Sequence, residues 1–247
     1  MSRLIAITGK GGVGKTTVSA LLIKHLLAAG KSPALAIDAD PNSCLDAALG
    51  VCVTATVGGV REEVKTASGT DANISKRELL RIKLEQGLVE ANGFDLIAMG
   101  RPEGAGCYCY ANNILKDIIA EISSQYPYVV LDNEAGLENL SRRIVQNVDL
   151  LVLVSDASNA GLQTLLRLHE LAGEMALSYG KLALVINRLR DNKLPGRMDE
   201  IRGKTRADII IGLPEDEEIT AFAESSRSFL EIADSNPVYE KVRELMQ

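Results

Sequence analysis

Histidine and cysteine are scarce in this chain of 247 residues, and no hydrophobic run is long enough to span a bilayer. The apolar start of the chain ends at once in a glycine-rich loop, so we expect no signal peptide. Four cysteines without such a leader favour free thiols in a reducing compartment, the cytoplasm, over a disulfide framework. The two histidines, His25 and His169, lie among apolar neighbours in predicted helices, which favours packed residues over ligands or bases.

Basic residues are not in excess. The chain has 27 Lys and Arg and 33 Asp and Glu, which gives a net charge of −6. This balance argues against nonspecific binding to nucleic acid, which requires a basic face. No linker, internal repeat or low-complexity tract divides the chain. We therefore expect one domain over residues 1–247, with neither nucleic acid nor a membrane as a partner.

A phosphate-binding pattern stands near the start of the chain. It fits G-x-x-x-x-G-K-[ST] and reads Gly9-Lys10-Gly11-Gly12-Val13-Gly14-Lys15-Thr16-Thr17. Glycines let the backbone N–H groups point at phosphate oxygens, Lys15 would reach the outer phosphates, and the Thr16 hydroxyl would ligate magnesium. An apolar strand precedes the loop and an apolar helix face follows it, which is the order that the motif requires. A glycine-rich turn without a ligand is the alternative.

Carboxylates follow the next predicted strand, Ala34–Ile37, which ends in Asp38-Ala39-Asp40-Pro41. Acidic residues at the carboxyl end of a parallel strand lie where ligands bind in open α/β sheets. The alternative is that Asp38 and Asp40 cap a turn and the next helix.

Two cysteines, Cys107 and Cys109, stand two residues apart after a glycine-rich run. In extended backbone their thiols face the same side, about 7 Å apart along the strand, which permits joint metal ligation. Two thiolates are too few for a closed tetrahedral site, but a two-fold dimer would supply four. Two small buried hydrophobic residues are the alternative.

Strand-like runs alternate with helical segments along the chain. The runs cover residues 4–7, 34–37, 94–99, 128–132, 150–154, 182–186 and 208–211. This alternation predicts an α/β fold with a mostly parallel central sheet and helices on both faces. A C-terminal helix near residues 237–246 is short and mixed in charge, so we expect it to dock on the core and not on a membrane.

The second lysine of the phosphate loop carries a family resemblance. The segment K-G-G-V-G-K-T-T resembles the deviant Walker A loop of the family that holds MinD, ParA, the nitrogenase iron protein and metal-insertion ATPases, a SIMIBI-type branch of the P-loop NTPases. The resemblance implies that the chain binds ATP and Mg²⁺ and forms a homodimer. In that dimer Lys15 is catalytic in its own subunit, and Lys10, also catalytic, reaches the nucleotide of the partner. It also implies that Asp38 and Asp132 hold magnesium through water and that Asp40 orients or deprotonates the attacking water. A solvated loop lysine is the alternative for Lys10.

Other segments resemble further parts of that family. Asn133–Gly136 would be the second switch. Asn187, followed by Arg188, would hydrogen-bond the adenine edge, and the loop Gly212–Asp216 with Leu213 and Pro214 would pack on the adenine from its other side. Ordinary turn chemistry is the alternative for both loops.

The run G-x-G-C-Y-C narrows the resemblance to CooC-type ATPases, accessory proteins of nickel enzymes of carbon monoxide metabolism. It implies that Cys107 and Cys109 of two subunits share one nickel or zinc ion. The client would be carbon monoxide dehydrogenase or, by the form D-N-E-A-G at residues 132–136, acetyl-CoA synthase. Cys44 could be a third metal-site thiol, but we expect it to be a packing residue. We expect the same of Cys52.

Three other functions share parts of this pattern. A MinD- or ParA-like regulator would need a membrane helix or a basic surface, and an iron–sulfur electron donor would draw its cysteines from two distant segments. A non-enzymatic metal-bridged scaffold would have no need of Lys10, Asp38 and Asp40. We therefore expect a Mg-ATP-dependent homodimeric ATPase that delivers metal to a client enzyme.

Overall fold

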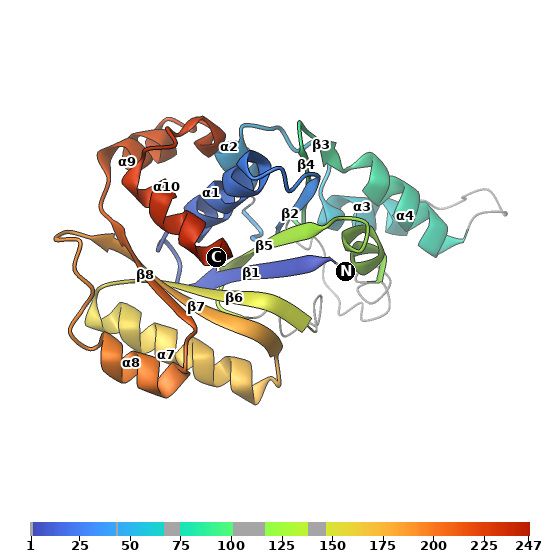
Figure 1. The fold of residues 1–247 in the computed structure, drawn as a ribbon. Helices are drawn as coiled ribbons and strands as arrows, with labels where there is room; N and C mark the ends of the chain where they lie inside the picture. The colour runs from blue at the N-terminus through green and yellow to red at the C-terminus, as the bar shows by residue number, and fades with distance from the viewer. Residues whose placement is uncertain (1, 43, 67–74, 101–116, 138–146) are drawn as a thin grey trace.

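The computed structural model describes residues 2–42, 44–66, 75–100, 117–137 and 147–247 (Figure 1). The strands of the described residues are β1 Arg3–Gly9, β2 Ala34–Asp38, β3 Val89–Glu90, β4 Phe94–Ala98, β5 Tyr128–Ala135, β6 Asn147–Asp156, β7 Ser178–Leu189 and β8 Ile209–Pro214. They form one sheet in the order β3-β4-β2-β5-β1-β6-β7-β8. Every neighbouring pair is parallel except β3 with β4, so the predicted α/β fold with a mostly parallel sheet is confirmed.

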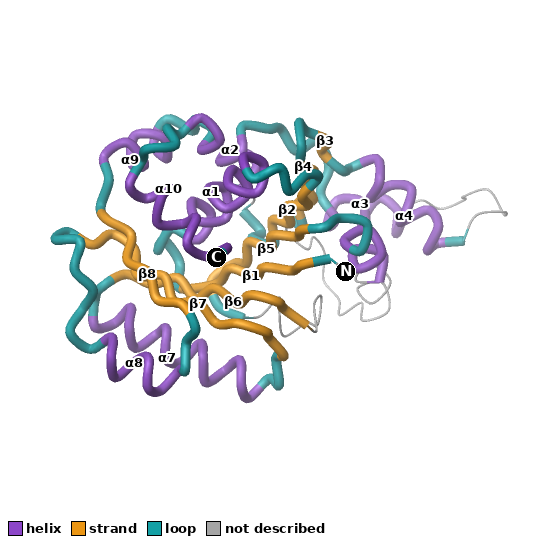
Figure 2. The backbone as a smooth tube through the Cα atoms, viewed as in Figure 1, coloured by secondary structure: helices purple, strands orange, loops and turns teal. Residues whose placement is uncertain are grey.

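Helices cover both faces of this sheet (Figures 1 and 2). Those with described bounds are α1 Lys15–Ala28, α2 Leu45–Leu49, α3 Val57–Thr66, α4 Lys76–Gln86, α7 Asn159–Glu174, α8 Met198–Thr205, α9 Glu217–Glu224 and α10 Pro237–Val242. One hydrophobic cluster joins the sheet to α1, α2, α9 and α10. The other joins it to α3, α4, α7, α8 and a helical segment at residues 117–123. The central strands are apolar on both sides because helices bury both faces.

The C-terminal segment packs onto α1, as the sequence predicts. Val238, Val242 and Leu245 are buried in the same cluster as the apolar side of α1. The Lys24 ammonium group stands 5.0 Å from the centre of the Tyr239 ring, which is itself buried. The C-terminal residues therefore complete the layer that covers one face of the sheet.

Several elements extend beyond the predicted bounds or were not predicted. The strand that ends in Asp132 continues through Asn133 to Ala135, so most of the expected second switch is strand. Helix α8 was not predicted, because its apolar positions Met198 and Ile201 are too few to show periodicity. Strand β3, an antiparallel edge of two residues, is too short to leave a pattern.

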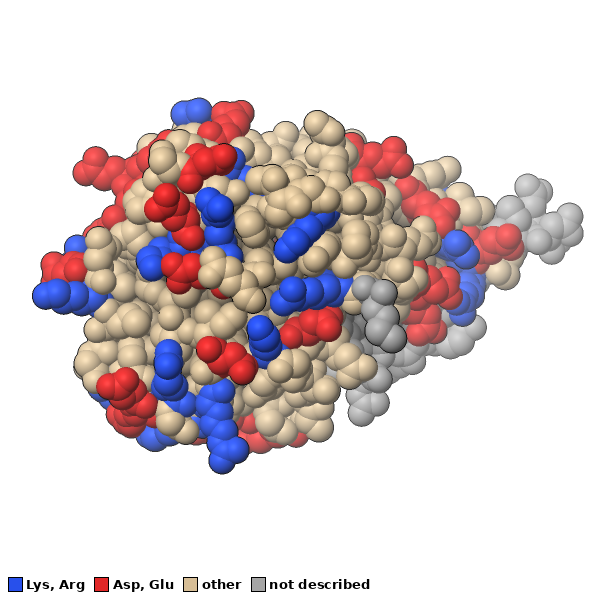
Figure 3. All heavy atoms as spheres, viewed as in Figure 1, with Lys and Arg blue, Asp and Glu red and all other residues tan. Residues whose placement is uncertain are grey.

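The surface carries charges of both signs. On the face shown in Figure 3, Lys and Arg side chains stand among Asp and Glu side chains and do not form one large field. Within the ranges that the structure describes, no helix has both the length and the apolar character needed to cross a bilayer.

Candidate nucleotide site

The phosphate loop joins β1 to α1 at the carboxyl edge of the sheet. Gly12 and Gly14 have φ values of +76° and +94°, in the left-handed region that favours glycine. A Cβ at Gly9 would collide with the carbonyl oxygen of Val154 on β6. The backbone therefore curls tightly in front of α1, whose first N–H groups and positive dipole end suit an anion.

The two lysines of the loop lie differently. Lys15 is only 8% exposed, and its ammonium group donates to the carbonyl oxygen of Lys10 at 3.2 Å. The Lys10 side chain is exposed at the rim. The pKa of Asp156, at the end of β6, is lowered first by the Ser158 hydroxyl, and the positive charge of Lys10 adds a smaller effect. Lys15 thus points into its own loop, whereas Lys10 lies at the surface near a carboxylate that the sequence analysis missed.

Two buried carboxylates stand side by side beneath the loop. Asp38 of β2 and Asp132 of β5 are paired in register on neighbouring strands. Asp132 is 1% exposed and accepts hydrogen bonds from Ser19, at 3.0 Å, and from Thr16. Burial first, and then the charge of Asp38, raise the pKa of Asp132 to about 7. Ser19 follows Lys15 by one helical turn and so lies on the same side of α1. This spacing is the only sequence signal that could have predicted its contact with Asp132.

Asp38 organises the segment that follows β2. Its two carboxylate oxygens accept from the backbone N–H groups of Asp40, at 3.0 Å, and Leu45, at 2.9 Å. Burial raises the pKa of Asp38 although these hydrogen bonds oppose the shift. Asp40 is half-buried, and its carboxylate accepts from the N–H of Asn42 at 2.8 Å. The turn-capping alternative therefore describes part of what both carboxylates do.

The oxygen atoms around Asp132 fit a magnesium ion. Two carboxylates and the Thr16 hydroxyl form a hard donor set, and Mg²⁺ in nucleotide sites typically takes one or two carboxylates together with phosphate oxygens and water. The raised pKa values of Asp38 and Asp132 mark negative charge that a divalent cation would offset. In the described part of the chain, no three His, Cys, Asp or Glu side chains converge as a metal site, either here or elsewhere.

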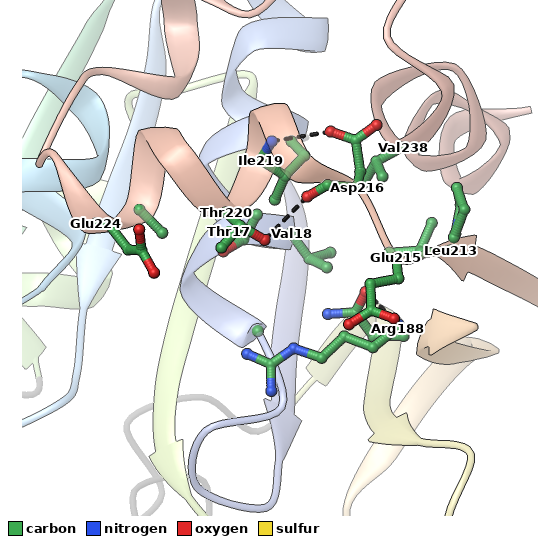
Figure 4. Close-up of a pocket in the computed structure, with 14 residues that line it drawn as sticks. Thr17, Val18, Arg188, Leu213, Glu215, Asp216, Ile219, Thr220, Glu224 and Val238 are labelled. Carbon is green, nitrogen blue, oxygen red and sulfur yellow. Dashed lines mark hydrogen bonds between the residues drawn. The ribbon is translucent and has the colours of Figure 1, made fainter. Parts of the chain in front are cut away.

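A cavity of about 330 Å³ opens beside the loop, between the ends of β7 and β8 and helices α1 and α9 (Figure 4). Its wall includes Gly14, Thr17, Val18, Asn187, Arg188, Leu213, Pro214, Glu215, Asp216, Ile219, Thr220, Ala223, Glu224 and Val238. The volume is that of a small-molecule site. The structure thus gathers the expected adenine-side residues Asn187, Arg188, Leu213 and Pro214 around one cavity next to the phosphate loop.

Asn187 also supports the phosphate loop directly. Its amide nitrogen donates to the carbonyl oxygen of Val13 at 2.8 Å, and its amide oxygen accepts from the N–H of Arg188 at 2.9 Å. A Cβ at Gly14 would collide with the same amide nitrogen. Gly14 is therefore required both for its φ and for the close approach of Asn187, a link that spacing in the sequence does not reveal.

The outer wall of the cavity is α9, which the sequence analysis did not predict. Asp216 caps this helix by accepting from the N–H of Ile219 at 2.9 Å. Buried Asn236 donates to Asp216 at 3.2 Å and to Glu218 at 2.9 Å, and thereby ties α9 to α10. An Asp followed by two Glu residues is a helix-start signal that could have found α9.

The cysteines give a mixed outcome. Cys107 and Cys109 lie outside the described residues. Cys44 and Cys52 are exposed, so the expectation that they pack in the interior was wrong. Cys44 directly precedes α2, where its side chain faces the surface beside the Asp38 turn.

The raised pKa of Asp132 predicts a pH-dependent stability in magnesium-free buffer. The folded chain keeps a proton up to about pH 7 that the unfolded chain releases near pH 3.8, so the stability contributed by this group is lost as pH rises through that window. Between about pH 5 and about pH 8 the unfolding free energy should therefore decline more steeply in wild type than in Asp132→Asn. Denaturant titrations at several pH values measure this, with Asp199→Asn on α8 as a surface control. Parallel profiles for wild type and Asp132→Asn would contradict it.

Comparison with known proteins identifies the family of the chain. A family model described as an AAA domain matches residues 2–179. An uncharacterized ATP-binding protein of Methanocaldococcus jannaschii is 41% identical, over 99% of this chain and 97% of the relative. The carbon monoxide dehydrogenase accessory protein CooC of Rhodospirillum rubrum is 31% identical, over 70% of each chain.

Solved structures share the same architecture. A ParA family ATPase from Chlorobium tepidum superposes with a TM-score of 0.75 at 18% identity, over 100% of this chain and 98% of that chain. At this identity the likeness concerns the fold, and the family model and the curated relatives carry the assignment. The chain belongs to the AAA-domain family and is a P-loop ATP-binding protein with a ParA-like fold.

Proposed function

We propose that the chain is a Mg-ATP-dependent homodimeric ATPase that serves as a metallochaperone, helping to insert nickel into carbon monoxide dehydrogenase or acetyl-CoA synthase. The observation that carries the ATPase is the convergence of Lys15, Thr16, Asp38 and Asp132 beside a cavity that adjoins the phosphate loop. The 31% identity with CooC and the C-x-C segment support the metal-delivery role.

Phosphate binding would use the Lys15 ammonium group and the N–H groups at the start of α1. The Lys15 ammonium group would exchange the Lys10 carbonyl oxygen for phosphate oxygens, which hold a full negative charge. The N–H groups at the start of α1 would hold the remaining oxygens. A magnesium ion held by Thr16 and, through water, by Asp38 and Asp132 would neutralise phosphate charge.

Hydrolysis would depend on positioning and charge neutralisation, without a covalent intermediate. Asp40 is half-buried two residues beyond Asp38, and in this proposal its carboxylate orients the attacking water. Lys10, exposed at the rim, would reach the phosphates of a second copy. Asn187 would contact the base and at the same time hold Val13 of the phosphate loop.

The metal cargo would be shared by two copies. Cys107 and Cys109 from each would supply four thiolates, a set that suits nickel or zinc. ATP-driven closure would complete this site, and hydrolysis would reopen the dimer and release the ion to the client. The same ATPase without thiolate-bound metal would be a MinD- or ParA-like switch, which the second experiment below distinguishes.

Loss of either the Lys15 ammonium group or the Asp40 carboxylate should strongly lower ATP turnover. We expect Lys15→Ala and Asp40→Ala to lower the ATP hydrolysis rate by about 100-fold or more, because loss of a charge-stabilising group on the phosphates or of a positioned acid–base group typically costs at least this factor. Phosphate release at saturating Mg-ATP measures the effect, with Asp199→Ala on α8 as the control. Wild-type turnover by Asp40→Ala would remove the catalytic role from that carboxylate.

The metal site should depend on the C-x-C pair alone. Metal content per chain, measured together with molecular mass, should give one nickel or zinc per two wild-type chains in the presence of ATP. Cys107→Ala/Cys109→Ala should lose this metal because it removes all four thiolates of the dimer. The matched control is Cys44→Ala/Cys52→Ala, which removes two exposed thiols and should retain the metal. Retention by the first variant, or loss by the second, would contradict the proposed site.

A further inference from the structure

Three polar side chains are buried on neighbouring strands just below the phosphate loop. Thr8 of β1, Asn133 of β5 and Ser155 of β6 are 0%, 1% and 2% exposed. Buried polar groups are costly unless they are hydrogen-bonded, so the partners of each atom matter. Ser155 donates to the carbonyl oxygen of Asp156 at 3.1 Å and is satisfied.

Asn133 is only half satisfied. Its amide nitrogen donates to the carbonyl oxygen of Ile7 at 3.0 Å, whereas its buried amide oxygen has no hydrogen-bond partner among the residues that the structure describes. Exchanging the two ends of the amide would place oxygen against oxygen, so the Ile7 contact fixes the orientation. The structure therefore holds a buried acceptor without a donor, directly after Asp132.

Thr8 carries a hydroxyl group on β1, the strand that pairs with β5 beside this acceptor. Ile7 pairs with Asp132, and the register then shifts so that Gly9 pairs with Ala135. Asp132 points toward α1, where it meets Ser19, so the residues that follow Ile7 and Asp132 both point to the opposite face. Thr8 and Asn133 thus lie on the same face of adjacent strands, which are about 4.8 Å apart.

The Thr8 hydroxyl is engaged elsewhere, with the end of β5. It donates to the carbonyl oxygen of Gly136, and the Gly136 N–H donates to the carbonyl oxygen of Gly9 at 3.2 Å. Gly136 has a φ of +100°, and a Cβ built on it would meet no atom of the described residues within 4 Å. A Cβ at Gly11 would lie 3.9 Å from the Cβ of Ala135. The segment that follows the strand therefore contacts the phosphate loop through the hydrogen bond from Gly136 to Gly9, and other described residues do not crowd the Gly136 α-carbon.

We propose that Thr8 and Asn133 form a two-position hydrogen-bond latch for the end of β5. In one position the Thr8 hydroxyl holds the Gly136 carbonyl oxygen, as the structure shows. In the other it rotates to the Asn133 amide oxygen and releases Gly136. The Thr8 hydroxyl can donate to only one of the two acceptors at a time. Each position therefore leaves the other acceptor without this hydrogen bond. The inference rests on the proposed function, because the phosphate groups in the adjacent loop would select the position.

The test measures the affinities for ADP and for a non-hydrolysable ATP analogue, with magnesium, by calorimetry. In Thr8→Val the hydroxyl is replaced by a methyl group of similar shape, so neither position can form. The ratio of the two dissociation constants should then shift by about fivefold from wild type, the effect of one hydrogen bond that differs between two states. Thr8→Ser keeps the donor and should retain the wild-type ratio.

Two further readings make the test specific. In wild type, hydrogen exchange of a peptide over residues 133–137 should differ between the two nucleotides, and this difference should shrink in Thr8→Val. In an Asn133→Ala background, Thr8→Val should shift the ratio by a clearly different factor, which is the coupling that a shared latch requires.

The outcomes separate this inference from the proposed function. A wild-type ratio in a folded Thr8→Val variant would overturn the latch and leave nucleotide binding intact. Independent effects of the Thr8 and Asn133 substitutions would also overturn it. Failure of every variant, wild type included, to bind either nucleotide would overturn the latch and the proposed ATPase together.

Discussion

The curled backbone of the phosphate loop is the constraint on which the rest of the site depends. Gly9 must lie against the carbonyl oxygen of Val154, and Gly14 must take a left-handed φ directly beneath the Asn187 amide. Both contacts come from strands on the same side of β1, so the sheet order sets the shape of the loop. Once the loop is held, α1 starts at Lys15 and its N–H groups face the space where phosphates would bind.

The same geometry gathers negative charge that is costly to bury. Parallel strands end at one edge, which brings Asp38 and Asp132 together in register. Burial raises the pKa of each carboxyl group, and for Asp132 the Asp38 charge adds to the shift. A site that bound nothing would gain by replacing either residue with an apolar one. A divalent cation together with the Lys15 ammonium group would offset the negative charge of Asp38 and Asp132, which explains why both carboxylates are buried here.

Much of this could be predicted from the sequence because the strongest signals are local. The phosphate loop, the carboxylates after β2 and at the end of β5, and the α/β alternation all follow from motifs or from apolar runs. The contacts that were missed join distant segments: Asn187 to Val13, Asn236 to Asp216, and Thr8 to Gly136. Register and long-range packing determine such contacts, and neither is written in residue spacing. Helix α9 was missed for a different reason, since its start signal was present but Asp216 was assigned to the expected adenine-side loop.

The central claim is that Mg-ATP brings two copies of the chain together through Lys10. Light scattering of the wild-type chain, with and without a non-hydrolysable ATP analogue and magnesium, tests this most directly when Lys10→Ala is measured beside it. We expect the wild-type mass to double with the analogue and Lys10→Ala to keep the mass of one chain while still binding nucleotide. A Lys10→Ala variant that dimerises like wild type, or a wild-type chain whose mass does not respond, would contradict it.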